Sequence, residues 1–475
     1  MGVRWLRCVF VLGLSGHGAF AEEPPVVPVE VLRAWETARV DPRARREETA
    51  PTATALTLDR LRLANGLDVV LAPDARSAHV RVLVTVNVGD GDAPDGQLQA
   101  AHVAEHLLFR DAPGLHPLGS VFAELSAGRG GGTTYSDRTL YETEVRPEHI
   151  ERLLWLESVR LAQAEAYVRA DALAHERSIL QHELALTTWR WPFLRGLALR
   201  AALPETHRSH ARWGSLGALD SLQQHAVLEL VHARYAPGNA RLTVVGGFEA
   251  AAVRAWIDRY FAPIPARATP PRPREDGPFD FVRTHLRART VHPATVVIAW
   301  PGVALDDCRN ANLRALVAVL RASISARPEF GAQASDGTRW SLEPVRQGSH
   351  IAVVFEARAE VGGDHGATLR AMDAALHDSV SALSSLHAMP SAIASSLDES
   401  LAEAARDLGA RASSIADLPS AVDPGGFRCA RSATRALEVT TLRELAGRVF
   451  AARRLVVEAR RDPTAVGLQI DEETL

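Results

Sequence analysis

The 475-residue chain contains no lysine, so all 53 of its basic residues are arginine. With 57 acidic residues the net charge is −4, and no basic excess points to a nucleic-acid partner. Hydrophobic residues make up 47% and charged residues 23%, which is typical of a globular protein. No segment beyond the N-terminus has an apolar run long enough to span a bilayer. The length allows two or more domains with their own cores.

The first 21 residues predict an export signal. Arg4 and Arg7 precede a short apolar run, and Ala19-Phe20-Ala21 forms an A-x-A cleavage site. The alternative is a membrane anchor, but the run is too short for one. We therefore expect cleavage after Ala21 and a soluble protein outside the inner membrane, in the periplasm or secreted. Loss of the two arginines would change the net charge to −6.

Cysteine is scarce, with three residues in the whole chain. Cleavage would remove Cys8 and leave Cys308 and Cys429. In an oxidising compartment these two could form a disulfide. Two buried free thiols are equally compatible with the sequence, and the spacing does not decide between the alternatives.

Composition and periodicity predict two α+β domains of comparable size. An irregular leader at 22–53 precedes a first domain at 54–262, and a linker at 263–279 with six prolines precedes a second domain at 280–475. In the first domain we expect a hairpin around Asn65-Gly66, strands near 79–91 and 131–145, and helices at 96–110, 148–161 and 170–189. A turn and strand at 235–248 and a helix at 250–261 complete it. We expect the second domain to repeat this plan, with strands at 294–303, 348–360 and 454–460.

The stretch "AAHVAEHLLF" places polar residues on an otherwise apolar helix. His102 and His106 lie one turn apart on the same face, with Glu105 beside them. Two imidazoles at this spacing can occupy two corners of a Zn²⁺ tetrahedron, and a nearby carboxylate can act as general base on a metal-bound water. The order His-x-x-Glu-His is the inverted form of a zinc-protease motif. The alternative is a helix whose two histidines are capped or paired within the core.

The downstream segment "HERSILQHELAL" places Glu176 and Glu183 two turns apart on one helix face. With this segment, and with "LANGLDVVL", "DRTLYETEV" and "YAPGNARLTVVGGF", the chain resembles the pitrilysin, insulin-degrading enzyme and mitochondrial processing peptidase family over about residues 56–465. The resemblance implies half of a clamshell made of two similar domains, each a mostly antiparallel sheet with helices on one face. It also implies that Glu183 is the third zinc ligand and that Glu176 supports the site. A solvated helix carboxylate is the alternative for Glu183.

Four other residues near these segments have simpler interpretations. His175 and His182 lie off the face that carries the two glutamates, so we expect both to be on the surface. Thr139 and Tyr141 alternate along a predicted strand, so we expect both to pack within the sheet.

The chain departs from the family pattern at two places. The resemblance implies a substrate-binding strand that contains Gly131 and Gly132, and Gly131 stands where the family has an asparagine that contacts substrate. Active relatives also use an arginine and a tyrosine from a second domain, whereas all five tyrosines here precede the linker. Arg327 or Arg339 could replace the arginine, with Trp340 nearby, although an ordinary loop is the favoured interpretation for that stretch.

These features together predict an exported zinc endopeptidase that acts on peptides or unfolded segments. The missing tyrosine predicts a heterodimer with a zinc-free subunit of the same family, in preference to a homodimer. A non-catalytic scaffold subunit is the main alternative, and a structural zinc protein is less compatible because such sites are usually closed by four ligands and rich in cysteine. Manganese or cobalt could replace zinc at such ligands.

Overall fold

The computed structural model describes residues 58–92, 99–127, 129–135, 137–187, 216–271, 282–288, 295–304, 307–330, 339–347, 350–358, 364–387, 407–409, 412–413, 438–451, 454–461 and 469–474. The predicted signal peptide, the leader, most of the Pro-rich linker and Cys429 lie outside these ranges. The described part contains two six-stranded sheets, each with helices packed on it. No helix within it combines the length and apolar character that crossing a bilayer requires.

The first sheet is built from the N-terminal half in the order β1-β2-β6-β3-β5-β4. Its strands are β1 (Asp59–Arg62), β2 (Asp68–Pro73), β3 (Val80–Val86), β4 (Gly130–Thr134), β5 (Thr139–Val145) and β6 (Ala240–Gly246). All neighbouring pairs are antiparallel except β2 and β6. The predicted hairpin is confirmed: β1 pairs with β2 across the Asn65-Gly66 turn, where Gly66 has a φ of 92° that a glycine adopts without strain.

The second sheet repeats this arrangement in the order β12-β7-β11-β8-β10-β9. Its strands are β7 (Val282–Ala288), β8 (Thr295–Ala304), β9 (Arg339–Gln347), β10 (His350–Arg358), β11 (Leu455–Arg461) and β12 (Gln469–Thr474). Again a single neighbouring pair, β7 with β11, is parallel. The α+β fold class and the repeated plan that the sequence predicts are therefore confirmed.

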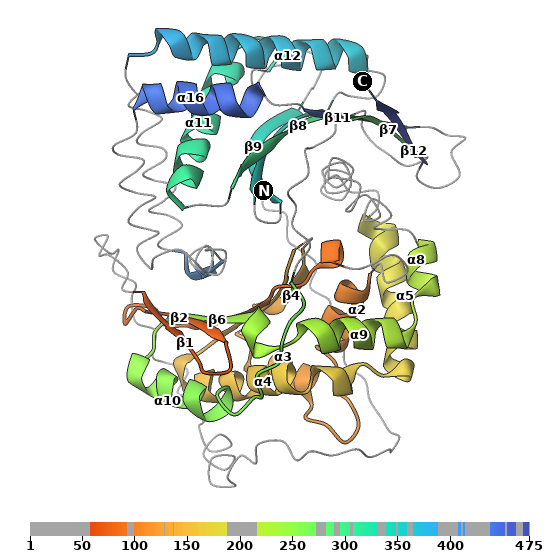
Figure 1. Ribbon diagram of the computed structural model, residues 1–475, viewed down its shortest axis with the longest axis vertical. Coiled ribbons are helices and arrows are strands. Elements are labelled where there is room, and N and C mark those ends of the chain that lie inside the picture. Colours follow the sequence, from red (N-terminus) through yellow and green to blue (C-terminus); the bar gives the residue numbers. More distant parts are fainter. Residues whose placement is uncertain are drawn as a thin grey trace.

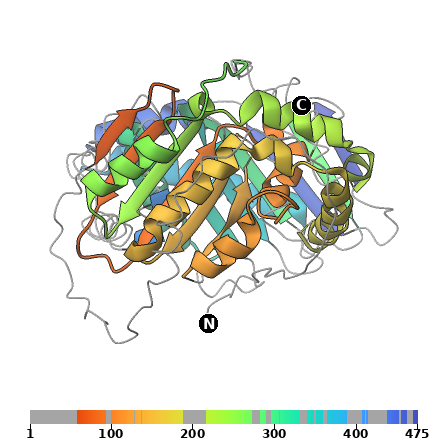
Figure 2. The ribbon, with the colours of Figure 1, turned by 90° about the horizontal axis from the view of Figure 1, so that it is seen from below.

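Helices cover the outer side of each sheet, and the two sheets face each other in the middle of the molecule (Figure 1). Those of the first half are α2 (Ala100–Leu107), α3 (Leu118–Leu125), α4 (Ile150–Ala162), α5 (Ala170–Thr187), α8 (Leu216–Ser221), α9 (Gln224–Arg234) and α10 (Ala250–Tyr260). Those of the second half are α11 (Asp307–Ser325), α12 (His365–Ala382) and α16 (Val439–Phe450). Figure 2 looks onto the helical side of the first half, where α4 and α10 pack against each other across the sheet.

Short helical turns join several of these elements. They are the 3-10 segments η1 (Asp90–Asp92), η2 (Pro147–His149), η3 (Ala164–Tyr167), η5 (Pro237–Asn239) and η6 (Leu383–Ser385). The last of them extends α12, and η3 leads from α4 into α5.

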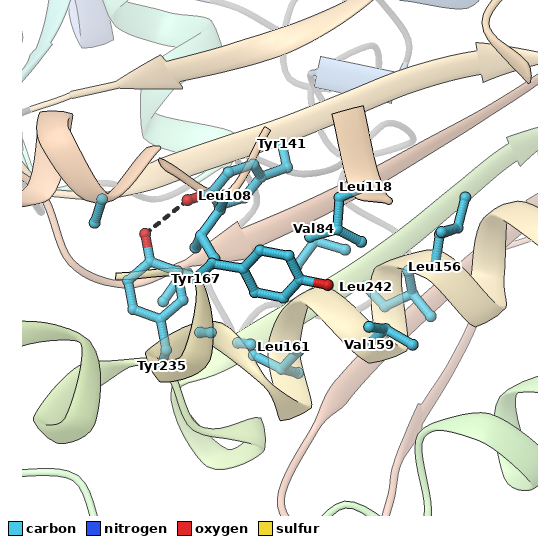
Figure 3. Close-up of a cluster of buried hydrophobic side chains, with 14 of the residues drawn as sticks. Val84, Leu108, Leu118, Tyr141, Leu156, Val159, Leu161, Tyr167, Tyr235 and Leu242 are labelled. Carbon is cyan, nitrogen blue, oxygen red and sulfur yellow. Dashed lines mark hydrogen bonds between the residues drawn. The ribbon is translucent and has the colours of Figure 1, made fainter. Parts of the chain in front are cut away.

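A hydrophobic core fills the space between the first sheet and its helices (Figure 3). Tyr141 of β5 and Tyr235, which follows α9, are both buried and share a hydrogen bond of 2.7 Å between their hydroxyl groups. Tyr141 and Thr139 thus pack within the sheet, as their alternation predicts. The hydroxyl pair satisfies two buried polar groups and joins the sheet to the C-terminal end of α9.

Three local predictions need correction. The helix expected at 96–110 is shorter, because Gln99 has a left-handed backbone and α2 begins only at Ala100. Within 131–145 the alternating strand begins only at Thr139 as β5, and the strand that the resemblance implies around Gly131 is the separate β4, which pairs with β5 in a hairpin. Arg339 and Trp340 do not lie in a loop: they begin β9, where the Trp340 ring packs on Phe355 and its Nε1 donates to a backbone carbonyl.

Candidate metal centre

Helix α2 presents its polar face next to β4 and α5. Its small and apolar residues are fully buried, which fixes the orientation of the helix. The same orientation holds His102 and Glu105 with only 9% and 7% of their surface exposed. Because buried polar groups require partners, the contacts of these side chains determine what the helix does.

Helix α5 brings its two glutamates to the imidazole of His106. Oε2 of Glu176 lies 2.9 Å from Nδ1, and Oε2 of Glu183 lies 3.4 Å from Nε2 of the same ring. Glu176 is 3% exposed and also accepts a hydrogen bond from Arg110. Glu183 is partly exposed. One glutamate therefore holds the far side of the ring while the other lies at its metal-facing nitrogen.

Three candidate ligands converge between the two helices. One ligand atom each from His102, His106 and Glu183 lie within 4.8 Å of one another. Two imidazole nitrogens and one carboxylate oxygen are a donor set that suits Zn²⁺, with room for a fourth ligand. The residues that the sequence singles out are thus adjacent in space, and the donor set fits the metal that the resemblance implies.

The electrostatics at His106 also favour a cation. Burial by itself lowers the pKa of His106, but the hydrogen bonds that its ring donates to Glu176 and Glu183 reverse this effect and raise the pKa to about 10. A pKa in this range means that the metal-free cluster holds a proton between its carboxylates. A metal ion would replace that proton with a larger positive charge.

Glu105 is close to the three candidate ligands but makes different contacts. Thr134 of β4 donates a hydrogen bond of 2.6 Å to its Oε2, and the backbone of Gly132 lies against the carboxylate. Burial raises the pKa of Glu105 to about 7, against the lowering effects of the His106 charge and the Thr134 hydrogen bond. This carboxyl group can therefore change protonation state near neutral pH.

Strand β4 is the edge of the first sheet and pairs with β5 alone among the described strands. Gly131 and Gly132 lie on this strand, with Gly132 toward Glu105 and nothing within 4 Å of the position that a Cβ on Gly131 would occupy. The edge that the resemblance assigns to substrate therefore runs past Glu105.

Other sequence-predicted residues lie away from the metal centre. His175 and His182 are exposed on α5, as predicted. Arg327 pairs with Asp378 of α12 at 2.5 Å. Trp340 is partly buried and packs against the core of the second half, so a substrate-binding role for it has no support from its position.

Sequence reasoning missed three contributors: Gln99, Arg110 and Thr134. Gln99 contacts His102 with its Oε1 3.2 Å from Nδ1. Arg110 follows α2 by one turn. A basic residue so close to the predicted ligands could have been recognised from the sequence as a partner for one of the two predicted glutamates. Thr134 could have been found from the register of β4 against β5, but the sequence pattern did not give that register.

Comparison with known proteins agrees with this architecture. A family model described as the Peptidase M16 inactive domain matches residues 221–327. A search of curated proteins finds no match. A protease from Helicobacter pylori is similar in structure, with a TM-score of 0.72, 18% identity, and coverage of 85% of this chain and 99% of that one.

Two longer proteins match over part of their length. The periplasmic protease PqqL from Escherichia coli gives a TM-score of 0.66 at 16% identity, over 86% of this chain and 48% of that chain. Pitrilysin gives 0.66 at 14% identity, over 88% and 47%. The chain thus corresponds to about half of each of these two proteins.

The fold is the half-clamshell arrangement of these structures, with two similar α+β halves. The resemblance to the pitrilysin family that the motifs predict is confirmed by the family model and by the shared fold. The matched segment 221–327 contains none of the residues of the candidate metal centre.

Proposed function

We propose that the chain is a zinc-dependent endopeptidase, in which His102, His106 and Glu183 hold the metal and Glu105 is the general base. The observation that carries this proposal is the convergence of three ligand atoms beside a buried carboxylate that is not one of them. A closed structural site would use four protein ligands, whereas here a catalytic group stands next to an incomplete set.

Each residue has a distinct task in this proposal. Zinc, when bound, polarises the scissile carbonyl and makes a water molecule more acidic. Glu105 takes the proton through Oε1, since Thr134 holds Oε2. With a pKa near 7 the same carboxyl group can return the proton to the leaving amine. Glu176 keeps the proton of His106 on Nδ1, which leaves Nε2 for the metal.

We further propose that substrate binds as an added strand along β4. A sheet edge offers backbone donors and acceptors that pair with any extended peptide. Gly131 contributes no side chain at the place where the family has an asparagine, so substrate affinity would depend on backbone pairing and on the other half of a clamshell. This favours peptides or unfolded segments over folded proteins.

A second subunit would complete the substrate site. This chain corresponds to half of pitrilysin and of PqqL, and it has no tyrosine after residue 260. We propose a heterodimer with a zinc-free family member that supplies the arginine and the tyrosine. The predicted signal at 1–21 and the likeness to a periplasmic protease support a periplasmic or extracellular location.

Two observations favour a second candidate function, that of a non-catalytic partner subunit. The matched family model is the inactive domain, and Gly131 departs from the family pattern. Against it, all the residues that the metal site and the base require are present and adjacent.

Metal content and peptide cleavage distinguish the two functions. We expect the chain without residues 1–21 to bind about one zinc ion. We also expect cleavage of a quenched fluorescent peptide library that a chelator abolishes. Zinc without cleavage, followed by cleavage on addition of a candidate partner, would support the heterodimer. Absence of zinc would rule out the peptidase and leave the partner function.

A further inference from the structure

Gln99 has an unusual backbone conformation directly before the metal-site helix. Its φ of 74° and ψ of −2° lie in the left-handed region, and it is the one non-glycine residue with positive φ in the described ranges. Residues with a side chain pay an energetic penalty there because the Cβ approaches the backbone. Such strain persists where the surrounding structure requires it, and it is concentrated at functional sites.

Burial of the Gln99 side chain is also energetically unfavourable. It is fully buried, and its amide Nε2 has no hydrogen-bond partner among the described residues. A buried amide group without a partner lowers the stability of the folded state. Among the described residues its side chain makes one polar contact, through Oε1, which lies 3.2 Å from Nδ1 of His102. The left-handed backbone and the buried amide nitrogen, which are both unfavourable, therefore accompany the interaction of Gln99 with His102.

That interaction determines which nitrogen of His102 carries a proton. An amide oxygen can accept a hydrogen bond but cannot donate one, so the contact requires a proton on Nδ1 of His102. The remaining nitrogen, Nε2, is then available as a ligand. The same relation holds at His106, where Glu176 lies 2.9 Å from Nδ1 and Glu183 lies at Nε2.

We propose that Gln99 is a positioning residue, which holds the ring of His102 and its Nδ1 proton so that Nε2 faces the metal. The inference rests on the proposed zinc site. The two histidines would then be oriented by different groups, His106 by a charged carboxylate and His102 by a neutral amide. A neutral acceptor adds no negative charge to a cluster that already contains Glu105, Glu176 and Glu183.

Two substitutions separate hydrogen bonding from packing. Gln99→Met keeps the length of the side chain but removes the acceptor, and we expect the zinc dissociation constant to rise ten- to a hundredfold. Gln99→Glu restores an acceptor oxygen, and we expect zinc affinity within about threefold of the unsubstituted chain, or tighter. Affinity is measured by competition with a chromophoric chelator on protein whose folding is checked by circular dichroism.

A matched control and a spectroscopic measurement complete the test. Gln223 also precedes a helix, but it has an ordinary φ of −99° and its Nε2 donates to the carbonyl of Ser221. We expect Gln223→Met to leave zinc affinity unchanged. In cobalt-substituted protein, Gln99→Met should alter the visible d–d bands and Gln99→Glu should restore them.

The outcomes distinguish this inference from the proposed function. Weaker binding in Gln99→Met, with recovery in Gln99→Glu, would support the positioning role. If zinc binds the unsubstituted chain and Gln99→Met binds it equally well with an unchanged cobalt spectrum, the role of Gln99 is refuted while the peptidase site stands. If the unsubstituted chain binds no zinc, both are refuted.

Discussion

His106 and Glu176 form a hydrogen bond of 2.9 Å that joins α2 to α5 at the candidate metal centre. Because Glu176 orients the ring, its replacement should weaken metal binding without removing a ligand. We expect Glu176→Ala to raise the zinc dissociation constant ten- to a hundredfold, as measured by chelator competition. Glu176→Gln should have a smaller effect, since an amide oxygen still accepts the hydrogen bond.

Glu124 provides the control for that experiment. It also pairs with an arginine, Arg152, at 2.8 Å, but its side chain is 62% exposed. Glu124→Ala should leave zinc affinity unchanged. Equal affinities for Glu176→Ala and Glu124→Ala would contradict an orienting role for Glu176.

Glu105→Gln should separate catalysis from metal binding. The amide has nearly the same shape but cannot accept a proton, so we expect kcat to fall by about 10²- to 10⁴-fold. Zinc content should stay at the value of the unsubstituted chain, because Glu105 is not one of the three converging ligands. Loss of zinc would show that Glu105 is itself a ligand, and unchanged kcat would remove it from the mechanism.

Thr134 should matter through its hydrogen bond to Glu105. Thr134→Val keeps the shape of the side chain and removes the donor that lies 2.6 Å from Oε2. Hydrogen bonds to charged groups contribute about 1.5–3 kcal/mol, so we expect kcat to fall about tenfold or more with zinc content unchanged. Thr134→Ser keeps the hydroxyl group and should retain most of the activity. Equal activity of the valine and serine variants would refute this role.

A buried ion pair on α4 predicts a pH-dependent stability. Arg160 is 2% exposed, its guanidinium lies 4.4 Å from the ring centre of Tyr141, and it donates to Glu157 at 2.9 Å. Burial raises the pKa of Glu157 from 4.5 to about 7, although the charge and hydrogen bond of Arg160 lower it. The folded state thus binds a proton more tightly than the unfolded chain does.

The contribution of the Glu157 carboxyl group to the free energy of unfolding is therefore full below pH 4.5 and is lost as the pH rises through 7. Glu157→Gln removes this titrating group. We therefore compare the free energies of unfolding of the unsubstituted chain and of the variant. The difference, unsubstituted minus variant, should fall by up to about 3 kcal/mol between pH 4.5 and 7.5. Other titrating groups cancel in this difference. Urea unfolding at several pH values measures it, and a difference that is constant or rises with pH would contradict the prediction.

The sequence predicted helix α2 and its candidate ligands because a short motif defines them. Polar residues at positions 102, 105 and 106 interrupt an apolar helix, and the family pattern links them to a glutamate on a later helix. It did not predict Gln99, since nothing distinguishes a glutamine with φ of 74° from one with an ordinary backbone. That conformation depends on tertiary contacts and not on local propensity.

Edge strands were harder to predict than central ones. β3, β6, β8 and β10 are rich in valine and buried, so their hydrophobic patterns are clear. β9 contains Pro344 and several charged residues, and β12 is largely acidic, which is typical of strands that lie at an edge. β4 is mostly glycine and threonine, and only its pairing with β5 defines it as a strand.

The strands of the two sheets follow the same spatial order, but one edge strand comes from a different place in the chain in each half. In the first half the strand beside β2 is β1, which comes first, whereas in the second half the strand beside β7 is β12, which comes last. The module common to both halves is therefore five strands. The sixth strand of each sheet is supplied by a flanking segment, which precedes the module in the first half and follows it in the second.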